Sequence, residues 1–245
     1  MKMNPLTADI TVSLLGLGSV KFGRNQGVKY PSAFELPSDA QCRDLLSIAR
    51  DAGVNLVDTA PAYGRAEERL GTLLRGQRSE WVLGTKVGET FDGASHFDFT
   101  AGGADASLAR SLRRLQTDYL DYVLLHSDGQ DDDVLNSGAC EALIRARDAG
   151  WVRAIGISSK TRAGGQAAME LGLDIVMMTL NSEDQSEAPL CELAHQLDRG
   201  ILVKKAMGSG HLDPQDSLTL VARTPGVSSI ISGTLNPKHF EPLRS

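Results

Sequence analysis

Short apolar runs alternate with amphipathic segments along the whole chain. Runs rich in Val, Ile and Leu predict eight strands, over residues 14–20, 55–60, 81–87, 121–126, 152–159, 174–181, 200–207 and 228–234. Helical spacing of apolar residues predicts helices over residues 38–53, 66–76, 105–117, 141–150, 164–172, 189–200, 217–224 and 236–243. Eight uninterrupted β/α units favour a single α/β domain over residues 1–245, a closed (β/α)8 barrel of parallel strands.

An open doubly wound sheet is the main structural alternative, because it uses the same alternating units. That fold usually carries a G-x-G-x-x-G phosphate-binding turn after its first strand. Here the glycines are Gly16, Gly18 and Gly23, and the third lies too far along the chain. The number of units and the failed fingerprint both favour the barrel.

Local turn chemistry supports several of these boundaries. Ser38 can cap the helix that follows it. Three glycines follow helical runs, where a left-handed backbone is often needed: Gly53, Gly150 and Gly200. Two long connections, 21–37 and 88–100, follow predicted strands. In a parallel barrel such loops lie over the mouth formed by the strand ends, so we expect them to determine which substrates bind.

Composition sets limits on partners and location. The formal net charge of −6 and the pI near 5.4 argue against binding nucleic acid or an anionic membrane through charge alone. The apolar runs are far shorter than the roughly 20 residues that a membrane helix needs, so no span is predicted. The first residues show no apolar core with a cleavage site, so we expect a cytoplasmic protein. Three cysteines without metal-ligand spacing predict reduced packing residues and no metal site: Cys42, Cys140 and Cys191.

Four polar residues lie at or just beyond the ends of the second, third and fourth predicted strands: Asp58, Tyr63, Lys86 and His126. A parallel barrel gathers its strand ends into one mouth, so we expect these side chains to meet there. A free tyrosine has a pKa of about 10, and a neighbouring ammonium lowers that pKa. A carboxylate can hold the lysine in place, and a histidine can polarise a carbonyl oxygen. The group is therefore suited to donating a proton while hydride adds to an aldehyde or ketone.

Each of the four residues also has a purely structural interpretation. Asp58 can cap a turn, and Tyr63 can pack its ring against a loop. Lys86 can be solvated, and His126 can satisfy a backbone carbonyl. Their common position at one rim favours the chemical interpretation.

The segments around these residues resemble the aldo-keto reductase family. The matching phrases are GLG at 16–18, VDTAPAYG at 57–64, GTKVG at 84–88, SLRRLQTDYLDYVLLH at 111–126 and GISS at 156–159. The resemblance implies a (β/α)8 barrel that binds a nicotinamide dinucleotide, usually NADPH. It implies that Tyr63 donates the proton and that Lys86 lowers the pKa of Tyr63. It further implies that Asp58 holds Lys86 and that His126 positions the carbonyl.

The resemblance also implies a cofactor site along the later strand ends. The implied cofactor-binding residues are Gly18, Ser19, Asp58, Ser158, Ser159, Lys204, Lys205, Met207, Gly208, Ser209, Gly233, Thr234 and His239. Met178 stands where the family commonly has a glutamine, and Lys204 stands where an aromatic ring often stacks on the nicotinamide. The stem of Lys204 can cover the ring, and its ammonium can meet phosphate. The family's arginine is missing near His239, so NADPH is the implied cofactor while NADH stays open.

The implied activity is NADPH-dependent reduction of an aldehyde or ketone to an alcohol, with Tyr63 as general acid and a small carbonyl compound as the partner. The resemblance also implies that the chain is a monomer. One alternative is a sensor or scaffold that binds the cofactor with little turnover, since auxiliary subunits of potassium channels resemble this family. A barrel isomerase of phosphorylated sugars is a third alternative. Because the sequence ends at Ser245, soon after the cofactor segment, we expect an open pocket or one closed by residues 21–37.

Overall fold

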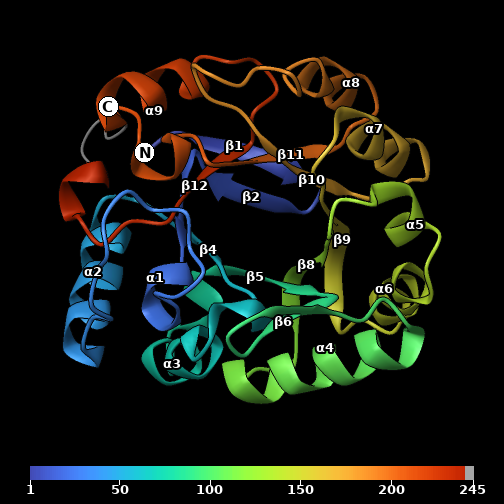
Figure 1. The fold of residues 1–245 in the computed structure, drawn as a ribbon, viewed down its shortest axis with the longest axis horizontal. Coiled ribbons are helices and arrows are strands. Elements are labelled where there is room, and N and C mark those ends of the chain that lie inside the picture. The colour runs from blue at the N-terminus through green and yellow to red at the C-terminus, as the bar shows by residue number, and fades with distance from the viewer. Residues whose placement is uncertain (241–245) are drawn as a thin grey trace.

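The computed structural model describes residues 1–240, and its centre is a closed barrel of parallel strands (Figure 1). Each strand pairs with the next around the barrel, and the last pairs with the first. In this order they are β3 (Leu15–Gly18), β4 (Leu56–Asp58), β5 (Val82–Val87), β8 (Leu120–His126), β9 (Val152–Ser158), β10 (Ile175–Thr179), β11 (Gly200–Lys204) and β12 (Ser229–Ser232). The predicted (β/α)8 barrel is confirmed.

Helices connect the strands and form an outer layer around them (Figure 1). They are α1 (Val20–Gly23), α2 (Asp39–Asp51), α3 (Ala66–Leu73), α4 (Ala101–Leu115), α5 (Asp131–Leu135), α6 (Gly138–Asp148), α7 (Arg162–Glu170), α8 (Leu190–Gln196) and α9 (Pro214–Ala222). Ser38 caps α2 as predicted, because its side chain accepts from the Gln41 N–H while the Gln41 side chain accepts from the Ser38 N–H. Buried free thiols lie in α2, α6 and α8, at Cys42, Cys140 and Cys191.

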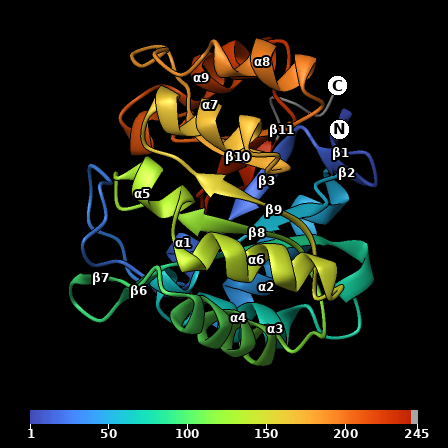
Figure 2. The ribbon, with the colours of Figure 1, turned by 90° about the vertical axis from the view of Figure 1, so that its right-hand side faces the viewer.

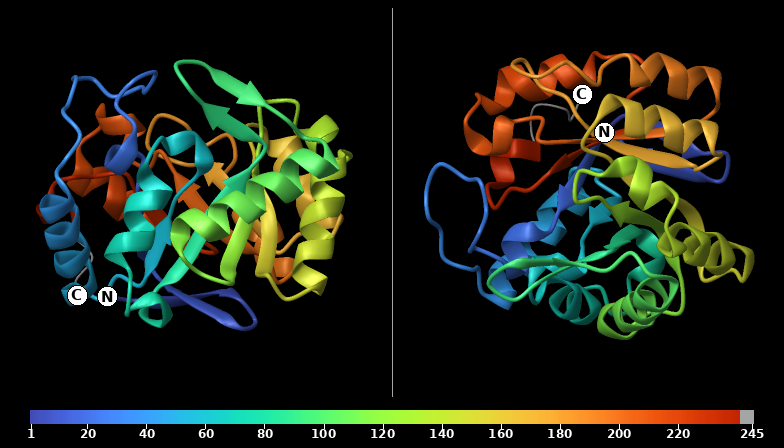
Figure 3. Two further views of the ribbon diagram at one scale, coloured as in Figure 1. Left: turned by 90° about the horizontal axis from the view of Figure 1, so that it is seen from below. Right: turned by 45° about the vertical axis from the view of Figure 1, so that its right-hand side comes forward.

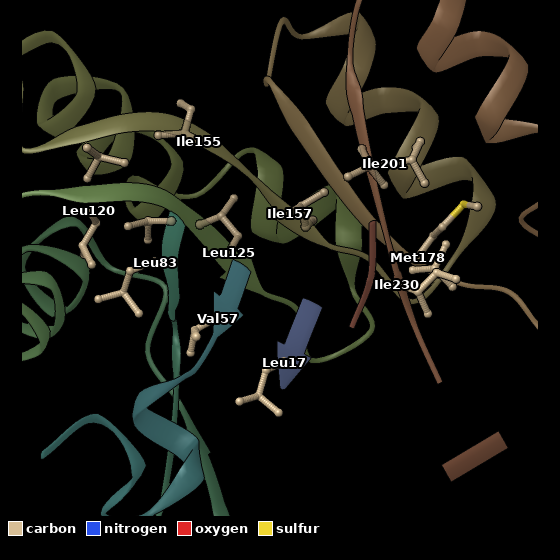
Figure 4. Close-up of a cluster of buried hydrophobic side chains, with 14 of the residues drawn as sticks. Leu17, Val57, Leu83, Leu120, Leu125, Ile155, Ile157, Met178, Ile201 and Ile230 are labelled. Carbon is tan, nitrogen blue, oxygen red and sulfur yellow. The ribbon is translucent and has the colours of Figure 1, made fainter. Parts of the chain in front are cut away.

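Alternation along each strand divides the core into two layers. Side chains that point outward pack against the helices, among them Leu83, Leu125, Ile155 and Ile157 (Figure 4). Side chains that point inward fill the barrel itself, and they include Leu56, Tyr122, Leu124, Ala154, Ile175, Met177 and Leu202. Since the interior is packed, a ligand site is confined to the ends of the barrel.

A hairpin that was not predicted covers the amino-terminal end of the barrel. It consists of β1 (Met3–Thr7) and β2 (Ile10–Ser13), and it lies at the opposite end from the long loops (Figure 3). Gly200 was expected to end a helix with positive φ, but it begins β11 instead. A Cβ at Gly200 would lie 2.2 Å from the carbonyl oxygen of Leu6 in the hairpin. The left-handed residue of this turn is Asp198, with φ of 53°.

The two long connections lie at the carboxyl-terminal end of the strands, as predicted (Figures 2 and 3). The first is an irregular loop after α1. The second contains a hairpin of β6 (Glu89–Phe91) and β7 (Ser95–Phe97). Gly88 turns the chain out of β5 into this hairpin with φ of 103°, a backbone conformation that favours glycine. Both segments therefore flank the mouth of the barrel.

The end of the described chain differs from the predicted helix over 236–243. Its described part is a 3-10 turn, Pro237–Phe240, and residues 241–245 lie outside the described residues. Positive φ values at Gly53 and Gly150, 85° and 79°, confirm the other two predicted helix-terminating glycines. Within residues 1–240, the longest helices are too short and too polar to cross a membrane.

Candidate functional site

Asp58 and Lys86 form a buried ion pair at the carboxyl end of the barrel. Asp58 ends β4 and lies opposite Gly84 of β5, and Lys86 follows two residues later on the same face. Lys86 Nζ donates to Asp58 Oδ1 at 2.5 Å and to Thr59 O at 3.0 Å. Burial lowers the pKa of Lys86, but Asp58 and Tyr63 raise it by more, so the lysine stays an ammonium.

Tyr122 completes the surroundings of Asp58 from inside the barrel. Its hydroxyl donates to Asp58 Oδ2 at 2.9 Å, so both carboxylate oxygens are hydrogen-bonded. Gly84 on the neighbouring strand makes room for the ring, since a Cβ there would lie 1.9 Å from Tyr122 Cζ. Tyr122 was not among the predicted site residues, although alternation along β8 puts it on the same face as His126.

Tyr63 ends a 3-10 turn, Pro61–Tyr63, that follows β4. Lys86 Nζ lies 5.0 Å from the centre of the Tyr63 ring. Burial raises the pKa of the phenol and the charge of Lys86 lowers it, and the net direction is upward. The expected effect of the ammonium is present, but burial outweighs it here, so the phenol is a protonated donor at neutral pH.

His126 ends β8 and faces Tyr63, with ring centres 6.3 Å apart and ring planes perpendicular. Its Nδ1 atom lies 2.9 Å from Oε2 of Glu89, the first residue of β6. Burial lowers the pKa of His126 while the Glu89 carboxylate raises it, and the net direction is downward. Glu89 was not among the predicted site residues. The sequence feature that could have identified it is its position just after the strand that carries Lys86.

The four predicted catalytic side chains therefore meet at one mouth, where they line a cavity of about 580 Å³. The predicted cofactor residues that also line this cavity are Gly18, Asp58, Ser158, Lys204, Lys205, Met207, Ser209, Gly233, Thr234 and His239. Three predicted cofactor residues stand outside the lining, namely Ser19, Ser159 and Gly208. Ser19 and Ser159 are fully buried, and the Ser159 hydroxyl donates to Glu187 Oε1 at 3.4 Å.

Lys204 ends β11 and reaches across the mouth toward β9. Its Nζ donates to Ser158 Oγ at 2.9 Å and to Ser159 O at 2.5 Å. The ammonium thus contacts two residues of the predicted cofactor site, Ser158 and Ser159. Burial lowers the pKa of Lys204 to about 7, against the raising effect of Glu187. Glu187 accepts from the Thr179 N–H at 2.7 Å, and no sequence motif marked it as part of the site.

The methionine that faces the cavity on β10 is Met177. It belongs to the inward-facing core and lines the cavity. Met178 packs outward against the helices (Figure 4). The assignment of Met178 to the glutamine position was wrong, because successive side chains of a strand point to opposite faces. Asn181 lies beyond the strand, where its Nδ2 donates to Lys205 O at 3.1 Å.

The far end of the cavity lies between β12 and the loop that carries Tyr30. Tyr30 OH donates to Gly233 O at 3.4 Å, and Lys21 Nζ lies 4.0 Å from the centre of the Tyr30 ring. Thr234 Oγ1 lies 2.8 Å from His239 Nδ1. Burial lowers the pKa of His239, and the charge of Lys21 lowers it further. Lys21 was not predicted, and it adds a positive charge to this end of the cavity.

The fold and the mouth define a β/α-barrel protein with a buried lysine, a tyrosine and a histidine around one cavity. A sequence model of the Aldo/keto reductase family matches residues 14–241, so the chain belongs to this family. The crystal structure of a putative aldo-keto reductase from Pseudomonas aeruginosa is 49% identical, with a TM-score of 0.90 over 98% of this chain and 92% of that chain.

Two curated relatives give the range of named activities. A D-threo-aldose 1-dehydrogenase from a Pseudomonas species is 32% identical over 197 residues, which are 70% of this chain and 57% of that protein. An NADH-specific methylglyoxal reductase from Escherichia coli is 28% identical over 226 residues, 83% of this chain and 66% of that protein. The matches span less than two thirds of the length of each curated relative.

Proposed function

We propose that the chain is an NADP(H)-dependent oxidoreductase that reduces an aldehyde or ketone to an alcohol, with Tyr63 as the general acid. The observation that carries this proposal is the Lys86 ammonium, held by Asp58, at 5.0 Å from the centre of the Tyr63 ring. Membership of the aldo/keto reductase family supports the same class of reaction. The names of the two curated relatives favour small aldehydes and sugars as substrates.

Residues at the mouth hold and transfer the proton, while the bound nicotinamide supplies the hydride. The protonated phenol of Tyr63 gives its proton to the carbonyl oxygen as the alcohol forms. Lys86 stabilises the phenolate that remains, because an adjacent ammonium offsets its negative charge. Asp58 keeps Lys86 charged and fixed, and His126 orients the substrate oxygen beside the phenol.

The cavity fits an elongated, negatively charged cofactor. Its lining extends from Lys86 and His126 to Gly233 and His239. The Ser158 hydroxyl lies near the proton-donating end and suits an amide. Lys21 and Lys205 supply positive charge for phosphates, which favours NADP(H). The NADH-specific relative makes NADH the alternative cofactor to be tested.

Consumption of NADPH or NADH with a panel of aldehydes, ketones and sugars tests the proposal. The Tyr63→Phe variant should bind the cofactor with unchanged affinity and lose about 10²- to 10⁴-fold in kcat. Lys86→Met should lose activity in the same way, because the phenolate then lacks its counter-charge. Tyr119→Phe, just before the first residue of β8, is the matched control and should keep full activity. An unchanged kcat in Tyr63→Phe would exclude Tyr63 as the acid.

A sensor or scaffold that binds the cofactor without turnover is the second candidate. The observation that favours it is the contact of Lys204 with Ser158, since this contact occupies a hydroxyl suited to the nicotinamide amide. Tight cofactor binding without consumption by any carbonyl compound would support the sensor. Absence of binding for both cofactors would contradict both candidates.

A further inference from the structure

Glu89 and His126 make a close contact at the edge of the mouth. Glu89 Oε2 lies 2.9 Å from His126 Nδ1, and the two side chains are only 11% and 17% exposed. Ser95 Oγ donates to the other carboxylate oxygen, Oε1, at 2.6 Å. The contact between Oε2 and Nδ1 lacks hydrogen-bond geometry and is electrostatic, and Nε2 is the ring nitrogen of His126 that is left for the cavity.

The backbone of the β6–β7 hairpin holds Glu89 in this position. Glu89 pairs with Phe97 across the hairpin, and the Asp98 N–H donates to Gly88 O at 2.9 Å to close its base. A Cβ at Gly88 would lie 2.3 Å from Phe99 Cε1, so this turn requires glycine. The contact with His126 is thus set by a defined turn next to the strand that carries the catalytic lysine.

His126 is surrounded by groups of both signs. Burial lowers its pKa most, and the charges of Lys86 on β5 and Lys204 on β11 lower it as well. Glu89 on β6 raises the pKa of His126. Tyr63 packs edge-on against the ring. The Glu89 carboxylate is therefore the charge that favours the protonated ring.

Glu89 itself is ionised over the whole working range of pH. Burial raises its pKa, but the contacts with His126 and Ser95, together with the charge of Arg24, bring the pKa to about 2. A lone pair on Nδ1 would face this negative charge at 2.9 Å, so the carboxylate favours a proton on that ring nitrogen, although the contact lacks hydrogen-bond geometry.

We propose that Glu89 is a positioning residue that fixes the proton of neutral His126 on Nδ1 and stabilises the imidazolium form, an inference that rests on the proposed carbonyl reduction. With its proton on Nδ1, neutral His126 presents a lone pair at Nε2 and has no hydrogen there to donate to a carbonyl oxygen. After protonation, Nε2 carries a hydrogen and donates to a carbonyl oxygen. Reduction therefore uses the imidazolium.

The first test observes the ring nitrogens of His126 by 15N NMR in the wild-type protein, with His126→Asn for assignment. The neutral ring should carry its proton on Nδ1. A neutral ring with its proton on Nε2 would overturn the proposal. Because this measurement needs no turnover and no folded Glu89 variant, it is independent of the proposed function.

The second test removes the charge of Glu89 while keeping its shape. Glu89→Gln should lower the pKa of His126 by about one unit or more. The fall of kcat for reduction with rising pH should move to lower pH by the same amount. Asp92→Asn is the control, since Asp92 lies on the same hairpin and its Oδ1 contacts exposed His96 at 2.8 Å.

The outcomes separate this inference from the proposed function. An unchanged pKa of His126 in Glu89→Gln, or an equal shift in Asp92→Asn, would overturn the role of Glu89. If the NMR results are as expected but no carbonyl compound is reduced, the proposed function fails while the effect of Glu89 on the ring stands.

Discussion

Tyr122 donates a 2.9 Å hydrogen bond to the oxygen of Asp58 that Lys86 does not bind. Tyr122 is fully buried, and burial together with the charge of Asp58 raises its pKa well above the usual value, so it stays a donor. We predict that Tyr122→Phe leaves Asp58 Oδ2 without a partner. The free energy of unfolding should fall by about 1–3 kcal/mol, measured by urea denaturation.

Tyr119→Phe is the matched control for this prediction. Tyr119 precedes β8 and lies away from the mouth. The centre of its ring is 4.2 Å from Cζ of Arg78. Its hydroxyl can be removed at a cost of less than about 0.5 kcal/mol. Equal losses of stability in the two variants would mean that the bond to Asp58 contributes nothing specific.

Gly84 is the second point on which this arrangement depends. A Cβ at Gly84 would overlap the Tyr122 ring, at 1.9 Å from Cζ. Gly84→Ala should therefore displace Tyr122 from Asp58 and lower the free energy of unfolding by at least about 3 kcal/mol, from overpacking and a lost hydrogen bond. Thermal and urea unfolding of the purified variant measure this loss.

Gly102→Ala provides the comparison for Gly84→Ala. Gly102 lies in α4, and a Cβ there meets no atom within 4 Å. Alanine in a helix should leave stability unchanged or raise it by about 0.5–1 kcal/mol. A Gly84→Ala variant as stable as Gly102→Ala would show that the barrel interior adjusts without cost.

Strand ends were predictable from the sequence because their signal is local. Asp58, Lys86 and His126 each follow a β-branched or leucine-rich run, and parallel topology then brings them to one end of the barrel. The direction of a side chain within a strand needs the register as well. A one-residue slip exchanges the two faces, and Met178 was assigned to the glutamine position although Met177 faces the cavity.

The contacts that the loops make could not be predicted from the sequence. Glu89 reaches His126 because the β6–β7 hairpin folds back over the mouth, and Lys21 reaches the far end of the cavity through its contact with Tyr30. The hydrophobic periodicity of the sequence predicts neither of these loop contacts. The pKa of Tyr63 depends on how deeply the phenol is buried as well as on the charge of Lys86. The sequence showed the charge but not the burial, so it did not predict that the pKa is raised.

Lys204 is a group whose charge changes near neutral pH. Its pKa is lowered to about 7, first by burial, so it is cationic below pH 7 and increasingly neutral above it. If the nicotinamide lies against Ser158 as proposed, Lys204 lies beside the ring. The oxidised ring carries a positive charge and the reduced ring is neutral, so only the oxidised form is repelled by the ammonium.

We predict that the affinity for the oxidised cofactor, relative to the reduced one, falls at least about fivefold as pH drops from 8 to 6, equivalent to about 1 kcal/mol of repulsion. The ratio of the two dissociation constants cancels titration of the phosphates that both forms share. Lys204→Met should abolish this pH dependence, because no charge then appears beside the ring. Lys160→Met, which removes an exposed charge from the same rim, should keep it. Fluorescence titrations at both pH values measure the ratio, and a pH dependence that survives in Lys204→Met would place the titrating group elsewhere.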